Sequence, residues 1–164
     1  TAQILLLYGV YLCLNSMSKK SVILIFLLII SPALIYFLWP FDEARIKKLI
    51  KEGAAAVEKE DIDNVMAKVS FNYQDNHGFT YILLKRVFED QFKRMSGIKV
   101  EYENLKIEVK DKSASASFDL LVIATIGNDT GYVIGDLKTP ARIKLFLGKE
   151  RVSWFVIKTE GLSF

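Results

Sequence analysis

The spacing of apolar residues changes twice along this chain. An unbroken apolar run occupies residues 21–41. From residue 42 to about 95, apolar residues recur at every third or fourth position, and beyond that point they alternate with polar ones. The pattern therefore predicts an apolar segment, then helices, then strands, in that order.

The apolar run has the length and flanks of a membrane span. Its 21 residues contain no charge, and a helix of that length reaches roughly 30 Å, the thickness of the hydrocarbon core of a bilayer. Lys19 and Lys20 precede it, and Trp39 and Phe41 lie near its far end. Positive charge before the span is typical of a helix whose N-terminus stays in the cytoplasm. We therefore interpret residues 17–41 as an N-terminal anchor that contacts the lipid bilayer through residues 21–41.

A cleaved signal peptide is the competing interpretation, because Ser31-Pro32-Ala33 resembles a cleavage site. Cleavage there would leave a mature chain that begins with the exposed apolar sequence LIYFLWPF, which favours the uncleaved anchor. The predicted location is a bacterial inner membrane, crossed once, with the N-terminus cytoplasmic and the soluble domain periplasmic or otherwise extracytoplasmic.

The segment 1–16 is interpreted as doubtful upstream sequence, because Met17 followed by Lys19 and Lys20 resembles a natural start. The alternative is an apolar hairpin partner of the anchor, although its apolar part is short for a full span. Cys13, the one cysteine of the chain, lies in this segment. Residues 42–164 therefore offer neither a disulfide framework nor a thiolate metal site.

Three helices are predicted after the anchor, over 42–59, 61–70 and 80–95, with Asp61 capping the second and Gly97 ending the third. Strands follow at about 98–109, 113–126, 141–147 and 151–158. In the first strand the apolar positions shift by one residue between Tyr102 and Leu105, which predicts a β-bulge and a curved sheet. The glycine-rich stretch 127–131 is predicted to be a loop.

These elements predict an α+β fold: a strongly curved antiparallel sheet whose apolar face is covered by the three helices, forming a cone with a tapering cavity. On the outer face of the sheet, Phe146 and Phe155 are predicted to form an exposed apolar patch suited to a homodimer or another protein partner.

Charge excludes some functions. Residues 42–164 carry 20 basic and 19 acidic residues, a net charge of +1, which gives no footprint for nucleic acid. With one histidine and no cysteine in the domain, no metal site is predicted. The sequence also lacks a glycine-rich phosphate loop, and no cofactor is predicted.

The stretch NYQDNHG, residues 72–78, belongs to a longer pattern, Ser70-x-x-Tyr73-x-Asp75-x-x-Gly78. With the helix and strand order, this pattern resembles the nuclear transport factor 2-like (cystatin-like cone) superfamily over residues 42–164, as a bacterial membrane-anchored member. The resemblance implies a cone fold with a pocket, and a turn closed by Gly78. Members of that superfamily include isomerase-like and dehydratase-like enzymes, transport adaptors and membrane-anchored domains, so the fold alone does not choose a function.

Two interpretations of the stretch are open. As a catalytic cluster, Asp75 or His77 would remove a proton from a small hydrophobic substrate while Tyr73 stabilised the product, as in an isomerase or lyase. As a turn, Asp75 or Asn76 would cap the third helix, Tyr73 would pack in the core and His77 would lie on the surface. The turn is favoured, because residues two apart on a turn point to solvent and the predicted inward strand positions carry no acid or base.

The predicted function is therefore a membrane-anchored, non-enzymatic domain that binds a protein partner or a small apolar ligand, with no catalytic residues. If a ligand binds, we expect aromatic residues at core spacing to line the pocket: Phe71, Tyr73, Phe88, Phe92, Tyr102, Phe118 and Trp154.

Overall fold

The computed structural model describes residue 28, residues 30–31 and residues 42–162. The chain divides into two compact units, Thr1–Pro40 and Phe41–Phe164, and all elements named below belong to the second. The predicted segment 1–16 and nearly all of the predicted anchor lie outside the described residues. Within the described part of the chain, no helix is both long enough and apolar enough to cross a membrane.

Three helices open the second unit: α3 (Asp42–Glu58), α4 (Ile62–Met66) and α5 (Tyr81–Arg94). α3 and α5 lie close to their predicted positions, because the apolar residues at helical spacing form their buried faces. α4 corrects a prediction: it ends at Met66 instead of reaching residue 70, because the chain from Lys68 onward bonds to β5. Asp61 caps α4 as expected: its carboxylate accepts a hydrogen bond from the backbone N–H of Asn64 at 3.1 Å.

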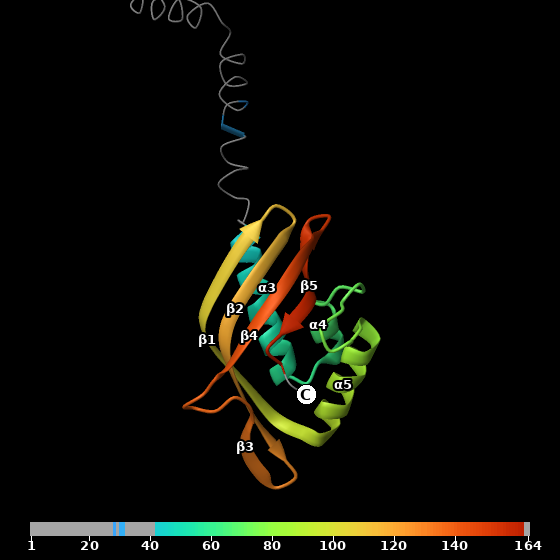
Figure 1. Cartoon of the computed structure of the whole chain (residues 1–164), viewed down its shortest axis with the longest axis vertical. Helices are drawn as coiled ribbons and strands as arrows, with labels where there is room; N and C mark the ends of the chain where they lie inside the picture. The colour runs from blue at the N-terminus through green and yellow to red at the C-terminus, as the bar shows by residue number, and fades with distance from the viewer. Residues whose placement is uncertain (1–27, 29, 32–41, 163–164) are drawn as a thin grey trace, which may run out of the picture. The chain divides into compact units, whose positions relative to one another are not determined.

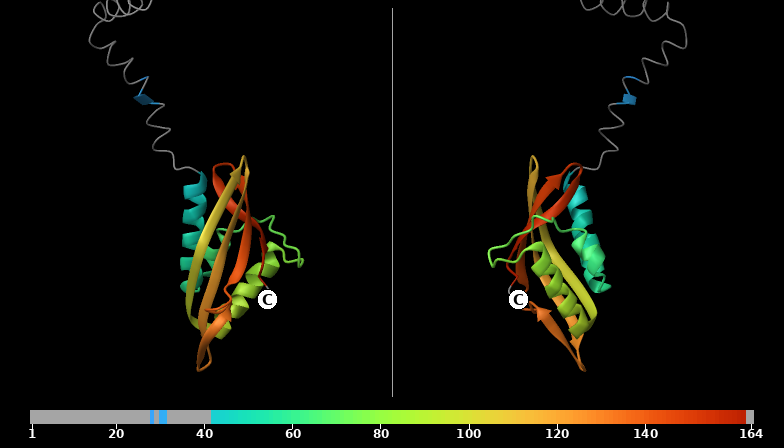
Figure 2. Two further views of the ribbon diagram at one scale, coloured as in Figure 1. Left: turned by 60° about the vertical axis from the view of Figure 1, so that its left-hand side comes forward. Right: turned by 90° about the vertical axis from the view of Figure 1, so that its right-hand side faces the viewer.

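Five strands follow and pair antiparallel: β1 (Met95–Lys110), β2 (Ser113–Ile126), β3 (Asp129–Ile134), β4 (Ala141–Glu150) and β5 (Ser153–Glu160). Their order across the sheet is β1-β2-β4-β5, and β3 pairs with the far end of β2. Figures 1 and 2 show the sheet curving past the helices, with α3 running along it. The α+β arrangement of three helices on a curved antiparallel sheet is the one predicted.

Two bulges bend β1. The predicted one is confirmed: the pairing with β2 shifts between Glu103 and Lys106, and Asn104 adopts a left-handed backbone with φ of 55°. The other corrects a prediction. Gly97 does not end α5, because the helix passes directly into β1 at Met95, and Gly97 with φ of 61° lies in a second register shift.

The stretch 127–131 was predicted to be a loop, but only part of it is. Gly127 and Asn128 alone make the turn, and β3 begins at Asp129. β2 is long enough to pair with β4 over 113–120 and with β3 over 122–126, so one strand serves two neighbours in succession. The sequence signal was weak because turn-forming residues occupy the first half of β3.

The chain from 68 to 74 covers the free edge of β5. The backbone N–H of Val156 donates to the carbonyl of Lys68, and Ser70 and Gln74 donate to the carbonyls of Val156 and Ile157. The unpaired backbone groups of an edge strand can hydrogen-bond to another chain. Here the segment 68–74 forms such hydrogen bonds with β5 within the same chain. The quoted stretch 72–78 thus begins as part of the sheet edge.

The outer face of the sheet does not carry the apolar patch that was predicted. Phe146 and Phe155 are half-buried, and the ammonium groups of Lys144 and Lys158 each lie 5.1 Å from the centre of the Phe146 ring. The two lysines shield the ring through cation–π contact. Pairing of two copies through this face stays a prediction.

Candidate ligand cavity

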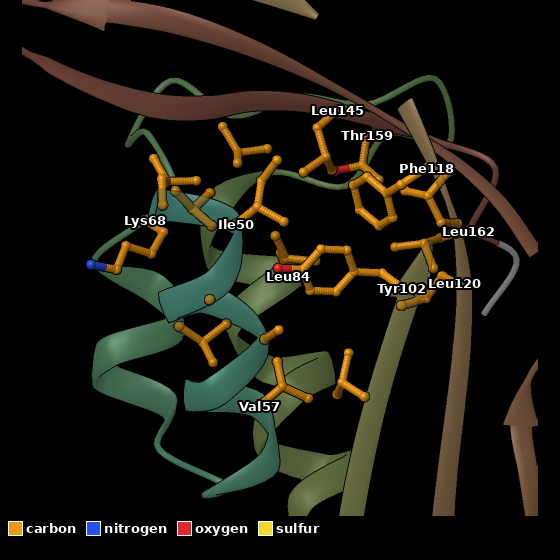
Figure 3. Close-up of a pocket in the computed structure, with 18 of the residues that line it drawn as sticks. Ile50, Val57, Lys68, Leu84, Tyr102, Phe118, Leu120, Leu145, Thr159 and Leu162 are labelled. Atoms are coloured by element: carbon orange, nitrogen blue, oxygen red, sulfur yellow. The ribbon is translucent and has the colours of Figure 1, made fainter. Parts of the chain in front are cut away.

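A cavity of about 180 Å³ lies between the helices and the sheet. It exists because α3 presents its smallest residues there: Gly53 and Ala54 both line the cavity, and a methyl group added at Gly53 would meet no atom within 4 Å. Opposite α3, the walls come from α5, β1, β2, β4 and β5. In Figure 3 the ring of Tyr102 projects from β1 into this space beside Leu84.

Four of the seven aromatic residues expected to line a pocket do so: Tyr73, Phe88, Tyr102 and Phe118. The rings of Tyr102 and Phe118 meet edge to face, with centroids 5.8 Å apart. Phe88, Tyr102 and Phe118 come from α5, β1 and β2, and Tyr73 comes from the chain between α4 and α5.

The other three lie outside this cavity, and Trp154 lines the outer hollow described below. Phe71 lies in the chain that covers β5 and is 83% exposed, with its ring against Tyr81. Phe92 packs on a separate cluster at the far end of the sheet. Trp154 is buried in the main core at the N-terminal end of α3, where its indole N–H donates to Asp42 at 3.0 Å. Core spacing alone does not distinguish these surroundings.

Lys68 is the one described residue lining the cavity that carries a formal charge at neutral pH. Its stem borders the cavity and its ammonium group points away from it (Figure 3). The ammonium pairs with the carboxylate of Glu52 on α3, and this hydrogen bond holds the pKa of Glu52 below its ordinary value. The remaining lining is almost wholly apolar, with hydroxyl groups from Tyr73, Tyr102 and Thr159.

Tyr73 is buried as expected, at 3% exposure. Burial, the largest cause, raises the pKa of its hydroxyl above the ordinary value of 10.0, so the phenol is protonated at neutral pH. The hydroxyl lies 3.4 Å from one carboxylate oxygen of Asp75.

Asp75 is occupied by the turn. Its other carboxylate oxygen accepts the backbone N–H groups of His77 and Phe79, each at 2.9 Å. This corrects the predicted cap, because the N-cap residue of α5 is Thr80, which makes no side-chain capping hydrogen bond, and Asp75 bonds to the turn before the helix. Gly78 has φ of 83°, as the reversal requires.

Of the three residues of the catalytic interpretation, only Tyr73 borders the cavity. Asp75 and His77 lie outside its lining, and His77 is exposed. Within residues 42–162 and the few described before them, no group of three or more metal-ligating side chains is gathered. The described lining contains no aspartate, glutamate or histidine.

A second hollow, of about 490 Å³, lies on the outside between α3 and the start of β5. Arg45, Lys48 and Glu52 of α3 line it together with Lys68. The sequence did not reveal this groove, because its walls come from segments 100 residues apart.

No family model and no curated protein matches the chain. Solved structures do. A Nostoc punctiforme protein of unknown function with a cystatin-like fold is 20% identical, with a TM-score of 0.58, over 74% of this chain and 90% of that one. A putative scytalone dehydratase from Novosphingobium aromaticivorans is 13% identical, with a TM-score of 0.62, over 75% and 89%.

A nuclear transport factor 2-like protein with a cystatin-like fold, also from Novosphingobium aromaticivorans, is 11% identical, with a TM-score of 0.57, over 73% of this chain and 79% of that one. Identities this low establish a common fold and leave function open. The chain has the nuclear transport factor 2-like, cystatin-like fold that its sequence predicts.

Proposed function

We propose that this protein is a non-enzymatic binding domain that takes up a small apolar ligand in the cavity between α3, α5 and the sheet. The observation that carries the proposal is the cavity itself: about 180 Å³ of apolar space, kept open by Gly53 and Ala54. An apolar cavity of roughly 150 Å³ is known to stay dry and to accept a benzene-sized ligand. The described lining supports binding rather than proton transfer, because it lacks a carboxylate or imidazole.

The volume also limits the size of the ligand. The cavity is slightly larger than the cavity of roughly 150 Å³ that accepts benzene, so it has room for about six to eight carbon atoms. Burying each methylene group of the ligand contributes about 0.8 kcal/mol to the free energy of binding. Part of this gain offsets the translational and rotational freedom that the ligand loses on binding. A single aromatic ring or a short alkyl chain fits these limits.

The test is to fill the cavity. In Ala54→Leu, the larger side chain occupies the space, and binding of toluene or 1-octanol should be lost. Binding is followed by methyl NMR of the full chain in nanodiscs of zwitterionic lipid, where the methyl groups of Leu84 and Leu145 line the cavity and those of the exposed Leu137 do not. The matched control is Ala44→Leu, which adds the same group on the exposed side of α3.

Loss of the cavity-specific shifts in Ala54→Leu, with binding retained in Ala44→Leu, is the expected result. If overpacking unfolds Ala54→Leu, the milder Gly53→Ala should still weaken binding, because its methyl group enters the same open space. Absence of any shift at Leu84 and Leu145 in the unmodified protein would contradict the proposal.

We further propose that residues 21–41 hold the domain at a bacterial inner membrane, with the domain on the periplasmic side. The charge-free run after Lys19 and Lys20 supports this location. Alkaline phosphatase fused after residue 164 should be active, because that enzyme folds only outside the cytoplasm. The mass of the membrane-extracted protein distinguishes an uncleaved anchor from a signal peptide removed after Ala33.

A further inference from the structure

Lys68 stands between the two hollows. Its side chain lines both the inner apolar cavity and the outer groove, and Leu49 is the one other described residue that lines both. The two spaces are therefore adjacent at this point. A ligand that emerges from the cavity beside Lys68 enters the groove.

The groove is basic. Arg45, Lys48 and Lys68 line it, and Glu52 supplies the one carboxylate among its described lining residues. Glu52 lies within 3.7 Å of the Lys48 ammonium and accepts a hydrogen bond from Lys68, and because its pKa is lowered it stays ionised at neutral pH. The guanidinium of Arg45 also donates to the backbone carbonyl of Val152 at 2.9 Å. Even with Arg45 left out of the count, Lys48 and Lys68 outnumber the one carboxylate of the described lining, so the groove has a net positive charge.

We infer that the ligand is an amphiphilic carboxylate: a short alkyl or single-ring body in the cavity, with its carboxylate at Lys68 in the mouth of the groove. This inference rests on the proposed function and names the class of its ligand. The apolar lining suits the body, and the positive groove suits the head group. The volume of about 180 Å³ indicates a free acid with a short body, since a long lipid tail exceeds it.

The carboxylate belongs outside the cavity rather than within it. Burying an ionised group in apolar surroundings without a paired charge is far more costly than burying a hydroxyl. Inside the cavity the described polar groups are the hydroxyls of Tyr73, Tyr102 and Thr159, none of which carries a positive charge. At the rim, the ammonium of Lys68 is partly exposed and already pairs with a carboxylate, that of Glu52.

The experiment compares octanoate with 1-octanol, which have the same chain and differ in the charge of the head group. Dissociation constants come from methyl NMR titration of the full chain in zwitterionic nanodiscs, read at Leu84 and corrected for ligand taken up by the lipid. Octanoate should bind about three- to five-fold more tightly than octanol, the effect of a partly exposed ion pair. Lys68→Gln should abolish that preference, and Glu52→Gln should increase it by freeing Lys68.

Two controls locate the head group. Lys85→Gln removes a lysine that also pairs with a glutamate on its own helix but lines neither hollow, so it should leave the preference unchanged. Tyr102→Phe removes a hydroxyl within the cavity, so any change in affinity should affect both ligands alike and the preference for octanoate should persist. Hexadecanoate should bind no more tightly than octanoate at equal free concentration, because its extra chain finds no room.

The outcomes separate the two claims. If octanol and octanoate bind equally and Lys68→Gln changes neither, the carboxylate assignment is wrong while the apolar site stands. A preference removed by Tyr102→Phe instead of Lys68→Gln would place the head group inside and overturn the inference. Tighter binding of hexadecanoate would point to a lipid tail. If neither probe shifts Leu84, both the inference and the proposed function fail.

Discussion

Replacing Gly53 with alanine should make the domain more stable and its ligand binding weaker. Gly53 lies in the interior of α3, where glycine costs roughly 0.5–1 kcal/mol relative to alanine because it loses more backbone freedom on folding. An added methyl group would meet nothing within 4 Å, so no clash offsets this gain. The residue is half-buried, and the methyl group contributes less than the ~0.8 kcal/mol of a fully buried one.

The expected gain in the free energy of unfolding is therefore about 1–1.5 kcal/mol. For a domain of this size, that raises Tm by roughly 3–6 °C. The measurement is thermal and urea unfolding of residues 42–164, followed by circular dichroism. This fragment contains both buried hydrophobic clusters in full.

Gly148→Ala provides the contrast. There the new methyl group would lie 3.2 Å from Ile157, so we expect no gain or a loss of stability. A fall in Tm for Gly53→Ala would refute the reasoning, because it would mean that the space beside Gly53 is too small for a methyl group. A rise in Tm with unchanged ligand affinity would show instead that the space beside Gly53 is not used for binding.

Three further predictions test the turn, the ion pair and the bulge. Asp75→Ala should lower the free energy of unfolding by about 1–2 kcal/mol, because two backbone N–H groups lose their acceptor, while His77→Ala should change it by less than about 0.5 kcal/mol in urea titrations. The hydrogen bond from Lys149 holds the pKa of Asp42 below its ordinary value of 3.8. The ionised Asp42 therefore stabilises the fold above pH 3.8, and this contribution is lost as the pH falls through the lowered pKa. In this acidic range, the urea midpoint of Asp42→Asn should depend less on pH than that of the unmodified domain. Asn104→Val should cost about 1–2 kcal/mol by the same assay because Asn104 is left-handed, and Asn104→Gly should cost little; equal losses would contradict a role for backbone conformation at this bulge.

Sequence patterns predicted those features that depend on neighbouring residues. The buried faces of α3 and α5 follow from helical spacing, and the bulge at Asn104 follows from the one-residue shift in alternation. β3 was missed because its pairing depends on the unusual length of β2, which a local pattern does not reveal.

The candidate site was harder to predict from the sequence, because a cavity forms where side chains from several distant segments leave space unfilled. Gly53 and Ala54 appear in the sequence only as small residues within a helix. Their importance depends on Tyr102 and Phe118, which lie opposite them and come 48 or more residues later in the chain (102 − 54 = 48). Similarly, the sequence predicts only that Asp42 lies at the start of a helix, where an acidic side chain is favourable. Its hydrogen bonds with Lys149 and Trp154 join residues more than 100 positions apart and are seen only in the structure.

The structural neighbour named as a putative scytalone dehydratase shares the fold of this domain, and the fold alone leaves open whether that activity is shared. A shared fold supplies a cone with an apolar interior, whereas chemistry requires an acid or base whose pKa and position suit the reacting atom. Here the buried phenol of Tyr73 has a raised pKa and stays protonated, so it can donate a hydrogen bond but is poorly suited to accept a proton at neutral pH. The carboxylate nearest to it, that of Asp75, holds two backbone N–H groups of the turn. Asp75 is thus committed to the turn, whereas Lys68 lies where the cavity and the groove adjoin, the position at which the proposed carboxylate would meet it.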